Sequence, residues 1–128
     1  MSIWLPTLEQ ILILHERLVL KTGGASGIRD IGLIQSALAR ADASFASVEL
    51  YPGVLAKAAA ICCGLTQNHG FVDGNKRIGV TTMLMILRKN TVTLSYTQDE
   101  LVELGLSIAQ GHADVPGTEA WIRAHISE

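Results

Sequence analysis

The sequence predicts an all-α protein, a compact bundle of about six helices around a central buried helix, with at most a short extended segment. Three observations predict this class. The length of 128 residues suits one domain, residues 1–128. A hydrophobic content of 48% and a mean hydropathy of +0.32 supply a core and argue against disorder. Apolar residues recur at helical spacing along most of the chain, without internal repeats.

The first two helices are predicted from amphipathic runs with clear ends. Residues 7–21 form the first helix, which Gly23 and Gly24 end. Its apolar residues are Leu8, Ile11, Leu12, Leu18 and Val19. After the loop GGASGIRD, Asp30 is the expected N-cap of a second helix that ends near Arg40. Residues 42–53, which include YPG, are predicted to be irregular.

The next two helices are predicted to be the most buried. The third covers residues 54–67 and is rich in small residues. The fourth begins at Asn75 or Lys76, continues to Lys89 and stops at Asn90. No charge occurs between Ile78 and Leu87. A helix that is apolar on nearly every side is normally surrounded by other helices, so we expect the fourth helix at the centre.

Two helices complete the expected bundle. Residues 91–94, TVTL, can form a short extended piece. Thr97 and Glu100 have the spacing of a capping box and open a helix that ends at Gly111. A last helix is expected at residues 117–126.

Charge and cysteine content exclude several classes of protein. The net charge is −2 and the isoelectric point about 6.1, so the basic excess typical of nucleic-acid binding is missing. Cys62 and Cys63 are adjacent and have no other cysteine as partner, which favours reduced thiols that act as small apolar side chains. We expect a soluble, cytoplasmic protein, since no signal peptide and no apolar run of about 20 residues is evident.

Polar chemistry is concentrated in NHGFVDGNKRIG, residues 68–79, between the two apolar helices. Lys76 and Arg77 stand at the start of a helix, where cations are unfavourable unless an anion binds there. Gly74 lets the backbone approach such an anion closely. The combination predicts a phosphate site. The alternative is that these cations mark where the helix reaches water.

Three neighbouring residues extend this prediction. Asp73 is compatible with Mg²⁺ bound between its carboxylate and phosphate oxygens, or with a turn or N-cap role. His69 is a candidate general base that takes a proton from a hydroxyl, or a residue that caps a helix end. Phe71 is interpreted as an anchor that pins the loop into the core. His15, His112 and His125 are interpreted as surface or cap residues.

Residues 69–77 resemble the H-x-F-x-[DE]-[GA]-N-[KG]-R motif of the Fic/Doc superfamily at seven positions, and GGASGIRDIGLIQSALAR is similar to the death-on-curing (Doc) toxin branch. The resemblance implies an all-α enzyme that uses a nucleoside triphosphate to modify a protein hydroxyl. It implies His69 as the base, Asp73 as the Mg²⁺ ligand and Phe71 as the loop anchor. The implied ATP-binding residues are Gly74, Asn75, Lys76 and Arg77.

Departures from the wider motif favour phosphoryl transfer. Adenylyl-transferring Fic enzymes usually have glycine where this chain has Lys76, and a second arginine where it has Val80. Doc shares both features and delivers the γ-phosphate of ATP. Gly74 is more similar to the wider Fic pattern, since the best-known Doc has alanine there. The alternatives are an adenylyl or other nucleotidyl transferase, and a non-catalytic nucleotide- or protein-binding module.

The resemblance also implies partners. The Doc branch belongs to toxin–antitoxin modules, so a Phd-like antitoxin chain is expected to block the site, and elongation factor Tu is the implied substrate. The chain shows no convincing [ST]-x-x-x-E-[GN] inhibitory segment of its own. Either GGASGIRD or residues 42–53 could form the flap that docks the target chain. Neither a membrane nor a nucleic acid is an expected partner.

Overall fold

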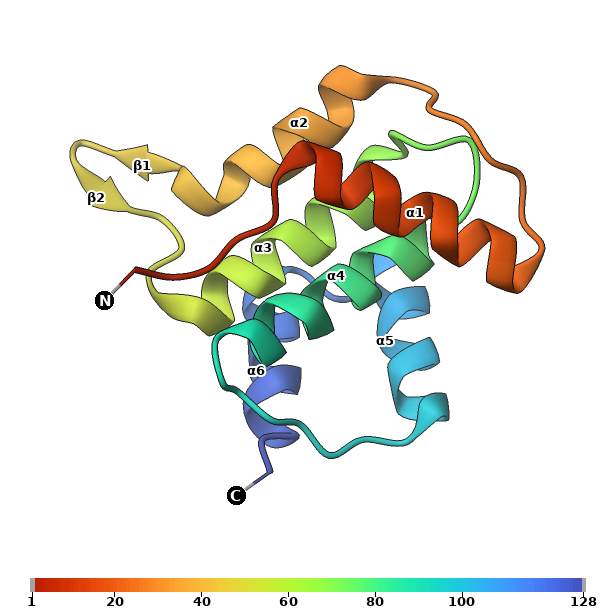
Figure 1. Cartoon of the computed structure of the whole chain (residues 1–128). Coiled ribbons are helices and arrows are strands. Elements are labelled where there is room, and N and C mark those ends of the chain that lie inside the picture. The colour runs from red at the N-terminus through yellow and green to blue at the C-terminus, as the bar shows by residue number, and fades with distance from the viewer. Residues whose placement is uncertain (1, 128) are drawn as a thin grey trace.

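A computed structural model describes residues 2–127 of the chain and confirms the all-α prediction (Figure 1). Within these residues, the only strands that pair as a sheet are two of two residues each. The elements are α1 (Leu8–Thr22), α2 (Ile31–Ala39), the 3₁₀ helix η1 (Arg40–Asp42), β1 (Ser44–Phe45), β2 (Val48–Glu49), α3 (Gly53–Asn68), α4 (Asn75–Lys89), α5 (Gln98–Ala109) and α6 (Val115–Ala124).

Helix ends follow the local signals in the sequence. Gly23 ends α1 in the left-handed conformation (φ 82°), and its N–H donates to the Val19 carbonyl. The Asp30 carboxylate caps α2 by accepting from two backbone N–H groups. Thr97 and Glu100 form the predicted capping box of α5. These ends of α1, α2 and α5 are therefore set by residues close in sequence.

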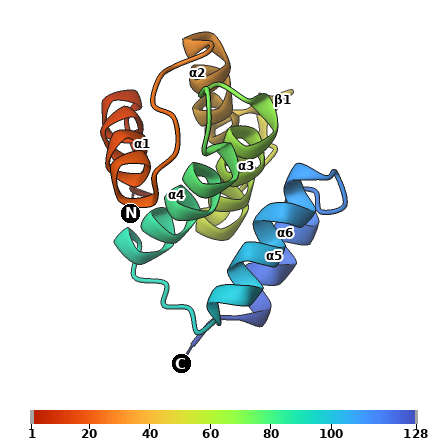
Figure 2. The ribbon, with the colours of Figure 1, turned by 90° about the vertical axis from the view of Figure 1, so that its right-hand side faces the viewer.

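The centre of the bundle is α3, which corrects the expectation that the fourth helix would hold this place. Every residue from 56 to 66 is buried, and α3 contacts α2, η1, α4, α5 and α6. In contrast, α4 leaves Leu84 and Met85 partly exposed. Small residues explain the difference, since the alanines of α3 let several helices approach its backbone. Figure 2 shows α1 and α2 on one side of the α3–α4 pair and α5 and α6 on the other.

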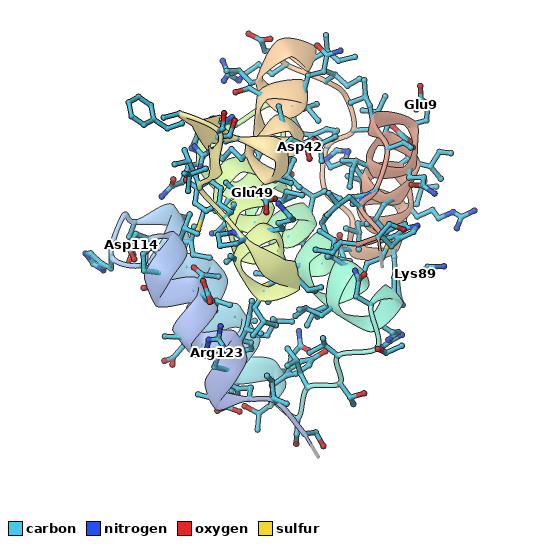
Figure 3. All side chains as sticks on the ribbon, turned by 90° about the vertical axis from the view of Figure 1, so that its left-hand side faces the viewer. Glu9, Asp42, Glu49, Lys89, Asp114 and Arg123 are labelled. Carbon is cyan, nitrogen blue, oxygen red and sulfur yellow. The ribbon has the colours of Figure 1, made fainter. Side chains whose placement is uncertain are left out.

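Residues 42–53 contain a short hairpin where an irregular segment was expected. β1 and β2 pair antiparallel, and Ala46 and Ser47 form the turn with positive φ values of 52° and 67°. Lys57 of α3, which is 6% exposed, connects the hairpin to the core. Its Nζ donates to the Ala41 carbonyl at 2.6 Å and to Glu49 Oε1 at 2.8 Å. Figure 3 shows Glu49 between the hairpin and α3.

Smaller features complete the comparison with the sequence. α6 begins at Val115, two residues before its expected start, because Asp114 accepts from the Gly117 N–H and caps the helix there. Residues 91–94 contribute a single bridge, between Leu94 and Ile126. Both cysteines are buried and free, and burial raises the pKa of their thiols. No helix within residues 2–127 is long and apolar enough to cross a membrane.

Candidate functional site

The predicted site residues lie together around one connection. His69 is the C-terminal cap of α3, residues 70–74 form a loop, and Asn75, Lys76 and Arg77 are the first turn of α4. α3 and α4 pack along each other, so the loop that joins them lies at one end of the bundle (Figure 1). The structure thus brings the motif to a single surface, supported by the two most buried helices.

His69 has a left-handed backbone, with φ 52° and ψ 47°. Few residue types other than glycine adopt this conformation, although histidine does so more often than most. Arg29 stabilises the turn: its Nε donates to the His69 carbonyl at 2.6 Å and its Nη2 to the Asn68 carbonyl at 3.3 Å. These bonds satisfy carbonyls that the end of α3 leaves without helical partners. The His69 residue itself is exposed, so its ring is available to a substrate.

Phe71, which was interpreted as an anchor of the loop, lies inside the core. The residue is 2% exposed and packs in the core. Its backbone forms a two-point contact with the Asn75 side chain, because Phe71 N–H donates to Asn75 Oδ1 at 3.1 Å and Asn75 Nδ2 donates to the Phe71 carbonyl at 3.1 Å. The Asn75 side chain therefore shapes the loop, while its backbone N–H belongs to the first turn of α4.

The Asp73 carboxylate is exposed and oriented by backbone groups. Ala25 N–H donates to Asp73 Oδ2 at 3.0 Å, and Gly74 N–H donates to Oδ1 at 2.7 Å. These two hydrogen bonds, Ala25 first, hold the pKa of Asp73 below its usual range. A Cβ at Gly24 would lie 2.8 Å from Asp73 Oδ2, so glycine is needed where the neighbouring loop passes the carboxylate.

The start of α4 carries positive charge and no side-chain cap. Gly74, the N-cap, has φ 76° and no side chain that could accept from the helix, and no other side chain in residues 2–127 caps it. The first N–H of α4 that bonds back along the helix is that of Ile78, which donates to the Gly74 carbonyl. The N–H groups of residues 75–77 therefore have no acceptor within the helix. Lys76 and Arg77 are both exposed, and Arg77 donates to Thr22 Oγ1 at 2.7 Å.

The glycine-rich loop between α1 and α2 runs along the motif. Ile28 forms an antiparallel bridge with Phe71, and Val72 N–H donates to the Gly27 carbonyl at 3.1 Å. Figures 1 and 2 both show this connection beside the one between α3 and α4. The hairpin of residues 44–49 is held at the other end of α3, by Lys57. Of the two candidate flaps, the glycine-rich loop is therefore the one that flanks the site.

Two residues of the site were missed in the sequence. His15 was interpreted as a surface or cap residue, but it is 2% exposed and lies under the loop. Its spacing gave a signal, because Ile11, His15 and Val19 are four residues apart and share the buried face of α1. Arg29 had no comparable signal, since its contact with α3 depends on how the loop folds back. His112 is exposed and His125 caps α6, as interpreted.

Comparisons with known proteins identify the family of the chain. Residues 5–87 match the model of the Fic/DOC family. A protein named Toxin Doc from Mycolicibacterium smegmatis is 35% identical over 100 residues, which cover 77% of each chain. A protein named Protein kinase doc from Escherichia phage P1 is 27% identical over 115 residues, which cover 90% of each chain. The family match spans more than half of the chain and includes the whole motif, and the chain belongs to the Fic/DOC family.

Proposed function

We propose that this protein is a Doc-like phosphotransferase that moves the γ-phosphate of ATP, with Mg²⁺, to a hydroxyl of a target protein. The observation that carries the proposal is the uncapped, positively charged start of α4, together with the ionised carboxylate of Asp73 and the exposed His69 in the connection that precedes it. Each group has a separate part in binding or transfer.

The start of α4 would bind the phosphates. Its first backbone N–H groups and the positive end of its dipole favour an anion. Lys76 and Arg77 add two exposed cations there, which would otherwise oppose the dipole. Gly74 and the backbone N–H of Asn75 complete a cradle without a Cβ at its N-cap.

Asp73 fits a Mg²⁺ site completed by phosphate oxygens and water, in which one carboxylate is enough. Its lowered pKa keeps it ionised, it is exposed, and Gly24 leaves the space beside Oδ2 that a Cβ would fill. When bound, Mg²⁺ would neutralise charge on the β- and γ-phosphates. Asp73 would hold it in a fixed direction, because Ala25 and Gly74 fix the carboxylate.

His69 would act as the general base. Its ring would accept the proton of the target hydroxyl while that oxygen forms a bond to the γ-phosphorus, and the bond from phosphorus to the bridging oxygen breaks to release ADP. Arg29 would support this role by fixing the turn that carries the ring. General base catalysis of this type contributes about 10²–10⁴-fold to the rate.

Position 80 favours phosphoryl over nucleotidyl transfer. Val80 is 8% exposed, and a Cβ on Gly105 of α5 would lie 3.5 Å from its Cγ1. This position thus faces the packing between α4 and α5 and supplies no second cation to the phosphates. The second cation near the phosphates would instead be Lys76, at an exposed position on the first turn of α4. The protein named as a kinase among the relatives supports the same choice.

The relative named as a toxin supports a role in a toxin–antitoxin module. We propose that a Phd-like antitoxin chain covers the start of α4 in the cytoplasm, and that elongation factor Tu presents a threonine hydroxyl as the substrate. The glycine-rich loop at residues 23–30 would dock the target, because it lies beside the motif.

Labelled nucleotide separates the candidate reactions. A cell lysate is incubated with the protein, Mg²⁺ and ATP that carries label in the γ- or the α-phosphate, and modified proteins are identified by mass spectrometry. Label from the γ-position alone, with the mass of one phosphate on a Ser or Thr, is the expected result. Label from the α-position would instead establish nucleotidyl transfer. Nucleotide binding without any transfer would favour a non-catalytic binding module.

Substitution of two histidines, one in the motif and one outside it, tests whether His69 is the general base. His69→Ala should lower phosphate transfer by about 10²–10⁴-fold while Mg·ATP binding survives. His112→Ala is the matched control, since His112 is also exposed but lies after α5, outside the motif. Equal loss of binding and transfer in His69→Ala would indicate that His69 is only structural.

A further inference from the structure

We infer that His15 of α1 is a positioning residue for this site, through one hydrogen bond to the peptide that joins Asp73 to Gly74. The inference rests on the proposed function, because it concerns how that site binds Mg·ATP. His15 lies outside the sequence motif and 58 residues before Asp73.

The contacts of His15 are specific to the loop. Its ring stacks on the Phe71 ring, with centroids 3.7 Å apart and planes 13° from parallel. Its Nε2 lies 2.7 Å from the Asp73 carbonyl oxygen. A Cβ at Gly74 would lie 3.6 Å from the same Nε2. The His15 ring therefore lies against the loop from Phe71 to Gly74, the N-cap of α4.

The partner determines the tautomer of the ring. A carbonyl oxygen can only accept, so Nε2 must carry the proton and donate it. The residue is 2% exposed, and water has little access to replace this bond. Loss of the donor would leave the carbonyl of Asp73 without this partner and free the peptide to rotate.

Rotation of this peptide would move both the Asp73 carboxylate and the start of α4. The carbonyl belongs to Asp73, whose carboxylate would hold Mg²⁺, and the next N–H, of Gly74, donates to that carboxylate. The same peptide sets φ of Gly74, which is 76° and directs the first turn of α4. A single buried N–H on α1 thus orients the carboxylate relative to the N–H groups of α4.

Two substitutions separate the hydrogen bond from the packing. His15→Phe keeps a ring that can stack on Phe71 but has no donor, and His15→Gln keeps an N–H donor near the position of Nε2 but has no ring. Calorimetry with Mg·ATP should show about 2- to 10-fold weaker binding for His15→Phe, the effect of one hydrogen bond. His15→Gln should recover most of the affinity.

His125→Phe is the matched control. This histidine also stacks on an aromatic ring, that of Trp121, and also donates to a backbone carbonyl, but it lies at the end of α6. Its replacement should leave Mg·ATP affinity unchanged. Wild-type affinity in folded His15→Phe, or equal weakening in both His15 variants, would overturn the inference and leave His15 as packing only.

The unmodified protein supplies an independent measurement. Nitrogen-15 NMR of the His15 ring should show a slowly exchanging proton on Nε2 in the absence of nucleotide. A proton on Nδ1 alone would also overturn the inference. Because these readouts are binding and tautomer, a protein that binds Mg·ATP but transfers no phosphate would contradict the proposed function only.

Discussion

Replacement of Gly79 by alanine tests the close packing of α3 against α4, the two helices that the motif connects. Gly79 lies in the second turn of α4, where that helix meets α3. A Cβ at this position would overlap the Thr66 hydroxyl and lie 2.9 Å from the Cys62 carbonyl oxygen. The hydroxyl can move only with its buried side chain, and the carbonyl belongs to the most buried helix of the protein. The two helices must therefore separate to accept the methyl group.

The magnitude follows from two opposing effects. Overpacking of a core costs about 1–3 kcal/mol, and contact with a buried backbone atom favours the upper end of this range. Alanine is better than glycine inside a helix by about 0.5–1 kcal/mol. We expect a net loss of roughly 2 kcal/mol in the free energy of unfolding. In urea denaturation, this loss would lower the midpoint by about 1 M.

Gly105→Ala is the matched control, since Gly105 is also a buried glycine inside a helix. A Cβ there would meet Val80 at 3.5 Å and Lys76 at 3.8 Å, which are ordinary contacts. The same change should therefore stabilise by about 0.5–1 kcal/mol. A second variant, Gly79→Ala with Thr66→Ala, should recover part of the loss because the overlapping hydroxyl is gone. If Gly79→Ala is as stable as Gly105→Ala, the close approach of α3 and α4 is not real.

Three further predictions concern contacts that hold the molecule together. If the proposed phosphate transfer is the reaction, Arg29→Met should reduce it about 10-fold in kinetic assays, because the substitution frees the turn at the end of α3. Arg17→Met, at an exposed position of α1, should not. The hydrogen bond between Glu100 and His125 raises the pKa of His125 and lowers that of Glu100 to about 2. The stabilisation from His125 is therefore present below its unfolded pKa, about 6.5, and lost as pH rises through the folded value, so thermal denaturation should show a drop above pH 6.5 that His125→Phe lacks. Stabilisation from Glu100 is lost only as pH falls from its unfolded value towards 2. Lys57→Met should destabilise by about 1–3 kcal/mol and speed limited proteolysis at residues 44–49, since it leaves a buried carbonyl without its donor; unchanged cleavage would show that Lys57 does not hold the hairpin.

The sequence alone determined the helices, most of their ends and the composition of the motif. Helical periodicity and capping depend on residues three or four apart, so Asp30, Gly23 and the Thr97–Glu100 box act within their own segments. The charge pattern around Lys76 and Arg77 is local in the same way. These features predicted the all-α class and the place where an anion would bind.

Only the tertiary structure decided which helix is central and what supports the motif. α3 holds the centre because its small side chains admit helices from several sides, and apolar content alone does not reveal this. The contacts of His15 and Arg29 with the loop span 58 and 40 residues. Such contacts depend on how whole helices pack, and no pattern within a single segment encodes the geometry that results.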